Sequence, residues 1–147
     1  MAAFGYDRGG QIKRAYGEKQ TDLYTYVQKI FYDEFGQRVY LQYGNGVETS
    51  YRYDEQRRWL QRILTRNSAG TVLQDTHYSF DRVGNVLGID NQARGVSQSF
   101  AYDDLHQLIG AQGVGPEQNG MSTYHQSYAY DGIGNLVDKS SSLLISP

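Results

Sequence analysis

The chain has 147 residues, of which 17 are glycine, 14 are tyrosine and only 2 are proline, and it has no cysteine. The lack of cysteine excludes disulfides, a thiol nucleophile, iron–sulfur clusters and thiolate zinc sites. The net charge of −2 lacks the basic excess of a nucleic-acid-binding protein, and no apolar run has the 18 or more residues of a membrane helix. We therefore expect one domain with no nucleic-acid partner and no membrane span. The first residues also lack the basic and apolar regions of a signal peptide.

Alternating residues predict short antiparallel strands along most of the chain. Apolar or aromatic residues occupy every second position in several segments, which is the pattern of a half-buried strand. The composition agrees with this pattern, because tyrosine favours strands and glycine favours tight turns. In chain order, the clearest segments are residues 24–32, 39–43, 47–53, 72–80, 96–102 and 124–130. No long helical pattern separates them, so we predict an all-β fold.

The connections between these strands are predicted from glycine, asparagine and aspartate. Gly44-Asn45-Gly46 is a hairpin signal, and residues 67–70 and 90–95 are expected to form longer turns. Residues 113–120 are predicted to form the longest and most mobile loop. Residues 54–64 carry apolar side chains at helical spacing, but they lie at a repeated turn motif. We therefore predict a turn followed by a strand there, with the basic pair Arg57-Arg58 solvated.

An aromatic residue followed by aspartate recurs six times, with long and short intervals in alternation. A glycine stands three residues after the aspartate in four of the six copies, and a glutamine or asparagine usually follows it. The aspartate can accept hydrogen bonds from backbone N–H groups of the turn, and the glycine supplies a positive φ angle. Each copy therefore predicts a hairpin closed by an Asp-x-x-Gly turn. The expected anchors are Tyr6-Asp7, Tyr32-Asp33, Tyr53-Asp54, Phe80-Asp81, Tyr102-Asp103 and Tyr130-Asp131, with Gly10, Gly36, Gly84 and Gly134.

Two copies depart from this pattern. Arg57 follows three residues after Asp54, and His106 three residues after Asp103, where the other copies have glycine. Because these residues disfavour a positive φ angle, we expect another turn type in both places.

The six copies resemble the YD-repeat, or RHS-repeat, family from residue 4 to about residue 137. That family includes bacterial RHS polymorphic toxins and the B and C components of insecticidal toxin complexes, with teneurins as animal relatives. The resemblance implies antiparallel hairpin repeats that form a curved sheet, or an arc of a β-solenoid or shell, around a C-terminal toxin or effector. It implies a scaffold rather than an enzyme, without a cofactor, within a larger secreted or cell-surface bacterial protein. Its partners would be further repeats of the same parent chain or the toxin cargo.

Family members usually end the shell with a segment containing an Asp-Pro pair, where self-cleavage releases the toxin. In this chain Pro116 follows Gly115 and Pro147 follows Ser146, so that pair is missing. We therefore expect a fragment, with the repeats in residues 1–139 and a non-repeat tail in residues 140–147. We also predict self-association, because open sheet ends expose strand edges that pair with other chains.

No arrangement of residues in the sequence predicts catalysis or metal binding. Turn formation explains the repeated aspartates, and the adjacent pair Asp103-Asp104 is a poor glycosidase dyad because neighbouring strand residues point to opposite faces. The histidines, His77, His106 and His125, lack the spacing of metal ligands. We expect His77 and His125 to face the solvent or the lumen of a shell.

The tyrosine stripe leaves one alternative function open. Aromatic residues at regular strand positions usually form cross-strand pairs within a sheet. On an exposed sheet face, tyrosine can instead stack on sugar rings, because it is amphipathic. The alternative is therefore a carbohydrate- or cell-surface-binding module, with Tyr51, Trp59, Tyr78 and Tyr128 as the candidate ligand-binding residues.

Overall fold

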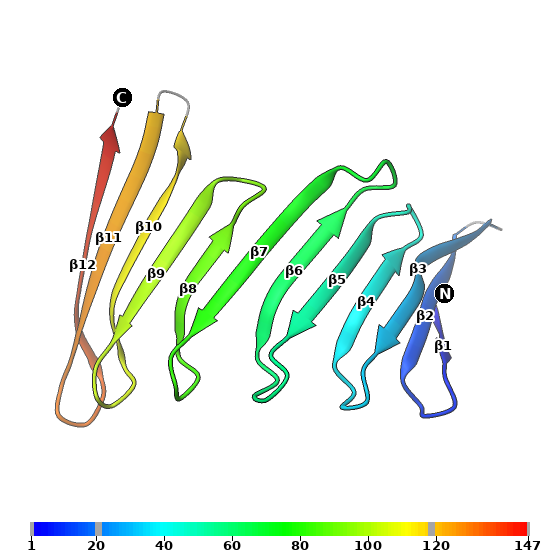
Figure 1. Ribbon diagram of the computed structural model, residues 1–147, viewed down its shortest axis with the longest axis horizontal. Helices are drawn as coiled ribbons and strands as arrows, with labels where there is room; N and C mark the ends of the chain where they lie inside the picture. Colours follow the sequence, from blue (N-terminus) through cyan, green and yellow to red (C-terminus); the bar gives the residue numbers. More distant parts are fainter. Residues whose placement is uncertain (1, 20–21, 118–119, 147) are drawn as a thin grey trace. The chain divides into compact units, whose positions relative to one another are not determined.

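The computed structural model describes residues 2–19, 22–117 and 120–146, and the regular elements of these residues are all strands (Figure 1). The all-β prediction is therefore confirmed. The chain divides into two compact units, one up to Gln74 and one from Asp75 onward. The strands are β1 Ala2–Tyr6, β2 Ile12–Lys19, β3 Asp22–Tyr32, β4 Arg38–Tyr43, β5 Glu48–Tyr53, β6 Leu60–Arg66, β7 Val72–Phe80, β8 Val86–Asn91, β9 Val96–Tyr102, β10 Leu108–Glu117, β11 Gly120–Tyr130 and β12 Leu136–Ser146.

In the first unit, strands β1 to β6 are hydrogen-bonded in sequence order, each antiparallel to the next. A row of buried side chains crosses the middle of this sheet. Leu41 of β4, which is 4% exposed, lies between Ile30 of β3 and Thr49 of β5. Thr49 is 5% exposed, and its Oγ1 lies 3.0 Å from Oγ1 of Thr65 on β6. The two threonine hydroxyls at the end of the row are therefore hydrogen-bonded to each other, as buried polar groups generally need to be.

In the second unit, the strands from β7 to β12 follow the same antiparallel order. Ala111 of β10, which is 8% exposed, lies between Phe100 of β9 and Gln126 of β11. Leu41 and Ala111 are the buried apolar residues among those described. Each unit is a single sheet, so cross-strand contacts between neighbouring side chains stabilise it rather than a thick core.

In both units a tyrosine ring lies over a glycine. A Cβ atom on Gly17 of β2 would lie 2.6 Å from Cε2 of Tyr26, and a Cβ atom on Gly113 of β10 would overlap the ring of Tyr124. Tyr124 and Gln98 pair with Gly113 from its two sides, and Gln98 Nε2 donates to Tyr124 Oη at 2.7 Å. The ring of Tyr124, on β11, therefore passes over Gly113 of β10 and reaches Gln98 of β9. A side chain on residue 113 would block this path.

This packing explains why the loop predicted over residues 113–120 is wrong for most of its length. β10 continues to Glu117, where Gly115 pairs with Ser122 and Pro116 with Met121. The glycines indicate a loop in the sequence, but Gly113 instead makes room for an aromatic ring. Proline is tolerated here because it lies close to the end of the strand. Residues 118–119 lie outside the described residues.

Two other segments show how far the strands extend. Residues 54–64 form a turn followed by β6, as predicted. Residues 140–146 continue β12, with Ser140 paired to Ser127 of β11, so backbone pairing passes the boundary expected at residue 139. The division into repeats and tail concerns the sequence pattern and stays a prediction. The described residues contain no helix that is long and apolar enough to cross a membrane.

Candidate functional site

Each expected anchor stands where an odd-numbered strand ends: its aromatic residue is the last residue of that strand, and its aspartate begins the turn to the next strand. Because consecutive strands are antiparallel, the three Asp turns of each unit share one edge of its sheet, which is the lower one in Figure 1. We call this the turn edge of each unit. In the first unit it consists of residues 7–11, 33–37 and 54–59, and in the second unit of residues 81–85, 103–107 and 131–135.

The aspartate of each turn accepts backbone N–H groups with Oδ1. Asp33 accepts from Phe35 at 2.9 Å and from Gln37 at 2.8 Å, and its own backbone N–H donates to the Gln37 carbonyl at 2.9 Å. Gly36 follows with a φ of 77°, and Gly10, Gly84 and Gly134 also have positive φ angles. The turn thus has the Asx geometry in which aspartate replaces a backbone acceptor and glycine adopts the left-handed conformation.

The two departing copies behave differently from each other. His106 has a φ of 62° in the glycine position, and Asp103 Oδ1 still accepts from Leu105 and Gln107, so the expected change of turn type is wrong there. The Asp54 turn does differ, because it is one residue longer: the Asp54 N–H donates to the Trp59 carbonyl. The left-handed residue is Arg58, with a φ of 61°, rather than Arg57.

The hydroxyls of four anchor tyrosines tie their hairpins to the hairpin before. In all four bonds the acceptor is the carbonyl of the first residue in the second strand of the preceding hairpin. The bonds are Tyr32 to Ile12 and Tyr53 to Arg38, each 2.9 Å, Tyr102 to Val86 at 3.0 Å, and Tyr130 to Leu108 at 2.9 Å. Phe80 has no hydroxyl for such a bond. Sequence reasoning missed these ties, although the preference for tyrosine over phenylalanine at the anchor was the available signal.

A second tie runs along the turn edge through the side-chain amide that stands four residues after the aspartate in every turn except the Asp54 turn. Gln37 Nε2 donates to the Arg58 carbonyl of the next turn at 2.9 Å. Asn85 Nδ2 lies 3.0 Å from His106 Nδ1 of the next turn. Gln107 Nε2 lies 3.1 Å from where a Cβ atom on Gly134 would stand. The amide of one turn therefore reaches the left-handed residue of the next.

In the turns with asparagine at this position, the amide also binds its own aspartate. Asn135 Nδ2 donates to Asp131 Oδ2 at 2.9 Å, and this bond, with backbone N–H groups, lowers the pKa of Asp131 below its ordinary value. Asn85 Nδ2 donates to Asp81 Oδ2 at 2.7 Å. Desolvation, the largest single effect, raises the pKa of Asp81, but the hydrogen bonds from Asn85, Val83 and Gly84 together lower it. Both turns therefore favour the ionised carboxylate.

Each of the four candidate ligand-binding aromatic residues has its own neighbours within its unit. Tyr51 of β5 has the Arg38 guanidinium 5.1 Å from its ring centre, and Trp59 has that of Arg57 at 4.8 Å. In the second unit, Lys139 lies 5.7 Å from the ring centre of Tyr128, and Tyr78 of β7 pairs with Ile89 of β8. Three of the four rings thus already carry a cation over one face.

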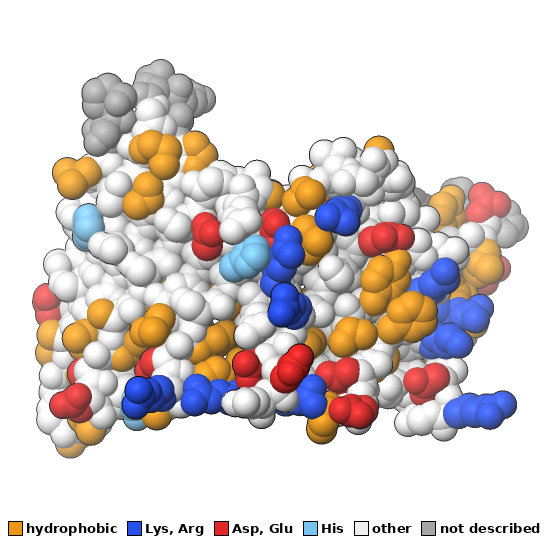
Figure 2. Space-filling view, viewed as in Figure 1, with side chains coloured by type: hydrophobic (Ala, Val, Ile, Leu, Met, Phe, Trp, Pro, Cys, Tyr) orange, Lys and Arg blue, Asp and Glu red, His pale blue; other side chains and the backbone are white. Residues whose placement is uncertain are grey.

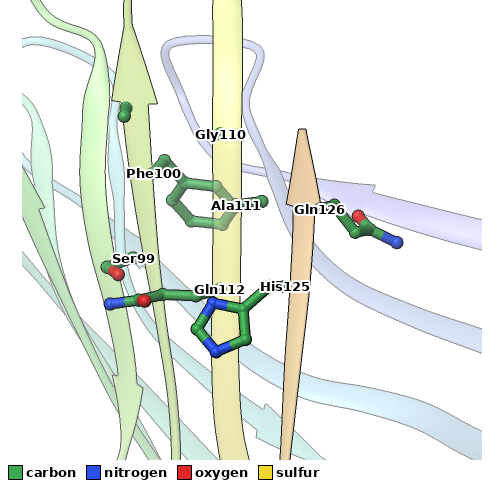
Figure 3. Close-up of a pocket in the computed structure, with 8 residues that line it drawn as sticks. Ser99, Phe100, Gly110, Ala111, Gln112, His125 and Gln126 are labelled. Carbon is green, nitrogen blue, oxygen red and sulfur yellow. The ribbon is translucent and has the colours of Figure 1, made fainter. Parts of the chain in front are cut away.

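A shallow hollow of about 300 Å³ lies across β9, β10 and β11 (Figure 3). Ser99, Gln112 and His125 share one row in it, because Gln112 pairs with Ser99 on one side and with His125 on the other. His125 is exposed, in line with the expectation that it faces solvent or lumen. Among the described residues, no group of three or more potential metal ligands is present.

Comparison with known proteins gives relatives of one kind. No family model matches the chain. The toxin subunits YenC1 and YenC2 of Yersinia entomophaga are 30% and 29% identical to it over 90% of its length. The chain spans only 17% of the length of each of these relatives.

Solved structures agree with these relatives. The crystal structure of TcdB2-TccC3-Cdc42 superposes with a TM-score of 0.87 and 29% identity, over 97% of this chain and 8% of that one. A structure of the Photorhabdus luminescens Tc holotoxin pore gives a TM-score of 0.86 with the same identity and coverage. The relatives match nearly the whole repeated region in sequence and in fold, and they confirm the resemblance of this chain to the YD-repeat, or RHS-repeat, family.

Proposed function

We propose that this chain is a structural segment in the wall of a toxin-subunit shell that encloses or displays a C-terminal toxin or effector. The observation that carries the proposal is the set of tyrosine hydroxyl bonds, which joins four of the hairpins to the preceding hairpin at the same point. Bonds that recur from hairpin to hairpin allow a sheet to be extended without a central core.

The relatives support this role. Two of them are toxin subunits, and the matching structures are of TcdB2-TccC3 complexes and of a Tc holotoxin pore. By analogy, the partners of this chain are further repeats of a longer parent chain and the toxin cargo. The parent is a secreted or cell-surface bacterial protein, and this segment is not an enzyme and needs no cofactor.

The carbohydrate-binding alternative has no comparable support. Tyr51 and Trp59 are each covered on one face by an arginine, and Tyr128 by a lysine. The hydroxyl of Tyr128 is also engaged, since it donates to Gln126 Oε1 at 2.6 Å. These rings are therefore used within the sheet, as cross-strand packing requires.

A chimera tests the scaffold proposal. The matching segment of YenC1 is replaced by this chain, and the purified chimera is treated with protease. If the chain builds the wall, the toxin region resists protease in the chimera as well as it does in unaltered YenC1 treated in parallel. The matched control is the same chimera with Tyr32, Tyr53, Tyr102 and Tyr130 all changed to phenylalanine, which removes only the hydroxyl ties. Protection should fall in this control. A chimera that folds and stays intact, but leaves the toxin region open to protease, would contradict the proposal.

A further inference from the structure

The first hairpin of the first unit carries three exposed cationic side chains, Arg8, Lys13 and Arg14. Residues 1–74 contain 11 of the 14 lysines and arginines but only half of the 16 acidic residues. Figure 2 shows Lys and Arg side chains along the right margin, where Figure 1 places β1 to β3. Among the described residues, none of the three side chains forms an ion pair or a hydrogen bond. Asp7, the acid of their turn, uses Oδ1 for backbone N–H groups of that turn.

A β-bulge brings two of these cations to the same side of the sheet. Arg14 of β2 pairs with Gly5 of β1. The next pair is Ile12 with Tyr6, so Lys13 is left over as an extra residue on β2. Successive strand residues normally point to opposite faces, and a bulge re-aims one of them. Lys13 and Arg14 accordingly line the same hollow.

The bulge itself does not require a lysine. The same irregularity recurs beside every Asp turn, and in the other five hairpins the extra residue is uncharged. These extra residues are Val39, Gln61, Leu87, Ile109 and Val137. The lysine of the first hairpin therefore has to be explained by something outside the bulge.

The hollow that the two cations line lies across β1, β2 and β3. Its volume is about 570 Å³, and its lining also includes Tyr16, Leu23 and Thr25. The Arg14 side chain lies across Gly5, where a Cβ atom would stand 2.8 Å from Arg14 Cγ. The glycine therefore lets the stem of the arginine lie flat on the sheet, and this holds the guanidinium at one end of the hollow.

The two ends of the hollow differ in charge. Lys13 and Arg14 lie next to the Asp turn, where Lys13 also lines a second hollow together with Arg8. Leu23 lies at the other end, paired with Glu18 of β2. Arg14 and Glu18 are four residues apart on one strand, which corresponds to about 13 Å. The cationic end and the apolar end are therefore about four extended residues apart.

An extended peptide fits this hollow better than a compact small molecule. A small-molecule site encloses most of its ligand, whereas Lys13, Arg14 and Leu23 are all exposed. The unpaired cations attract an acidic side chain at their end. Leu23, which is 70% exposed, gains from burial under an apolar side chain at the other end.

We propose that this hollow binds an extended acidic peptide segment. A carboxylate of the segment contacts Lys13 and Arg14, and an apolar residue about four positions away contacts Leu23. The carboxylate offsets the repulsion between two cations that the bulge holds side by side. The guanidinium of Arg14 also suits a carboxylate, because it can donate two parallel hydrogen bonds. This inference goes beyond the scaffold role and does not depend on it.

Fluorescence anisotropy in low salt tests the site on the 147-residue chain. The probe is a fluorescein-labelled hexapeptide with glutamate at its first two positions and leucine at its last two. Lys13→Gln combined with Arg14→Gln should weaken binding about tenfold, since each exposed ion pair contributes about threefold. The matched control is Lys29→Gln combined with Arg52→Gln, which removes two exposed cations of the same unit that lie outside the hollow. Equal weakening in the two double variants would overturn the proposal.

Changes in the peptide provide a second test, which needs no variant of the cations. The unaltered chain should bind the probe more tightly than a probe with glutamine in place of glutamate, and equal binding would overturn the proposal. Serine in place of the two leucines should weaken binding to the unaltered chain but not to Leu23→Ser, which lacks the apolar end. An equal loss in both proteins would contradict the placement of the leucines. A single-stranded oligonucleotide should displace the probe poorly, and displacement as strong as that by unlabelled peptide would show a general attraction of charges instead of a peptide site.

Discussion

The two units use the same turn in different ways, and the difference lies in the amide four residues after the aspartate. In the first unit Gln37 is long enough to pass its own aspartate and bind the Arg58 carbonyl, and Arg58 in turn covers Phe35. In the second unit Asn85 is shorter, and it binds Asp81 of its own turn as well as approaching His106. Asn135 binds Asp131 of its own turn in the same way, whereas Gln107, the glutamine of the second unit, reaches toward Gly134 of the next turn as Gln37 reaches toward Arg58. One methylene group therefore decides whether the amide also binds the aspartate of its own turn.

The largest effect should come from filling the space under Tyr124. Gly113→Ala would place a Cβ atom inside the Tyr124 ring and push its hydroxyl away from Gln98. We expect a loss of about 1–3 kcal/mol in the free energy of unfolding, as in other overpacked sites. Urea unfolding measures the loss, and hydrogen exchange locates it in β10 and β11.

The same change in the first unit should cost less. Tyr26, over Gly17, is 58% exposed, so its ring can swing outward when Gly17→Ala is made. Gly110→Ala is the control on β10, because its nearest neighbour would be the Ala101 Cβ at an ordinary 3.6 Å. An equal loss at residues 17, 110 and 113 would contradict this account of the tyrosine rings.

The hydroxyl ties should give the next largest effect. Tyr102→Phe and Tyr130→Phe remove partly buried bonds of the second unit, whereas the bonds of Tyr32 and Tyr53 are exposed. We expect losses of about 0.5–1.5 kcal/mol, with those in the second unit at the upper end, because buried carbonyls left without a donor cost more. Urea unfolding of the four single variants gives the comparison.

Tyr6→Phe is the control for these variants. It removes the same hydroxyl from an anchor that makes no such bond within the described part of the chain, and Tyr6 is 60% exposed. Its stability should not change. If Tyr6→Phe costs as much as Tyr102→Phe, the hydroxyl acts through something other than the tie.

A smaller loss should follow when the cover of Phe35 is removed. Arg58→Lys keeps the charge but loses the flat guanidinium that stacks on the ring. We expect a loss of about 0.5–1 kcal/mol, the size of an exposed cation–π contact. Arg8→Lys, in the exposed first turn, is the control and should leave the free energy of unfolding unchanged. A loss that disappears in Phe35→Ala would show that the ring is the partner.

The sequence predicts the hairpins well because the Asp turn is a local device. Aspartate, the turn amides and the left-handed residue lie within five positions of one another, so a short stretch of sequence contains the whole pattern. The strand after the Asp54 turn is predicted correctly for the same reason, although the extra residue moves the left-handed position to Arg58.

The sequence does not predict a structural feature whose cause lies on another strand. Gly113 indicates a loop until Tyr124 is seen to cover it from β11. From the sequence, the tyrosines are expected to pack in cross-strand pairs. Their hydroxyl bonds become visible only when the structure places the carbonyls of the preceding hairpin beside them. Arg58 looks solvated, but it covers an aromatic ring about twenty residues earlier in the chain. Each of these contacts joins residues from different hairpins, which a local pattern does not report.

The smallest effect should be a pH dependence confined to the turns that have asparagine. The lowered pKa values of Asp81 and Asp131 mean that their ionised forms bind the turn better than the protonated forms do. Their contribution to stability is therefore complete above the ordinary aspartate pKa, about 3.9, and is lost as the pH falls through the lower folded-state value. Asn135→Ala removes the largest cause of the lowered pKa of Asp131, so it should destabilise the chain at pH 7 and lose this effect in strong acid.

Gln37→Ala is the matched variant in the first unit, where the amide binds the Arg58 carbonyl, a group that does not titrate in this range. Its cost should stay the same between neutral and acidic solution, provided that both remain on the folded side of the transition. Urea unfolding of both variants across this range separates the two kinds of turn, and a parallel pH dependence in the two would show that the amides act alike.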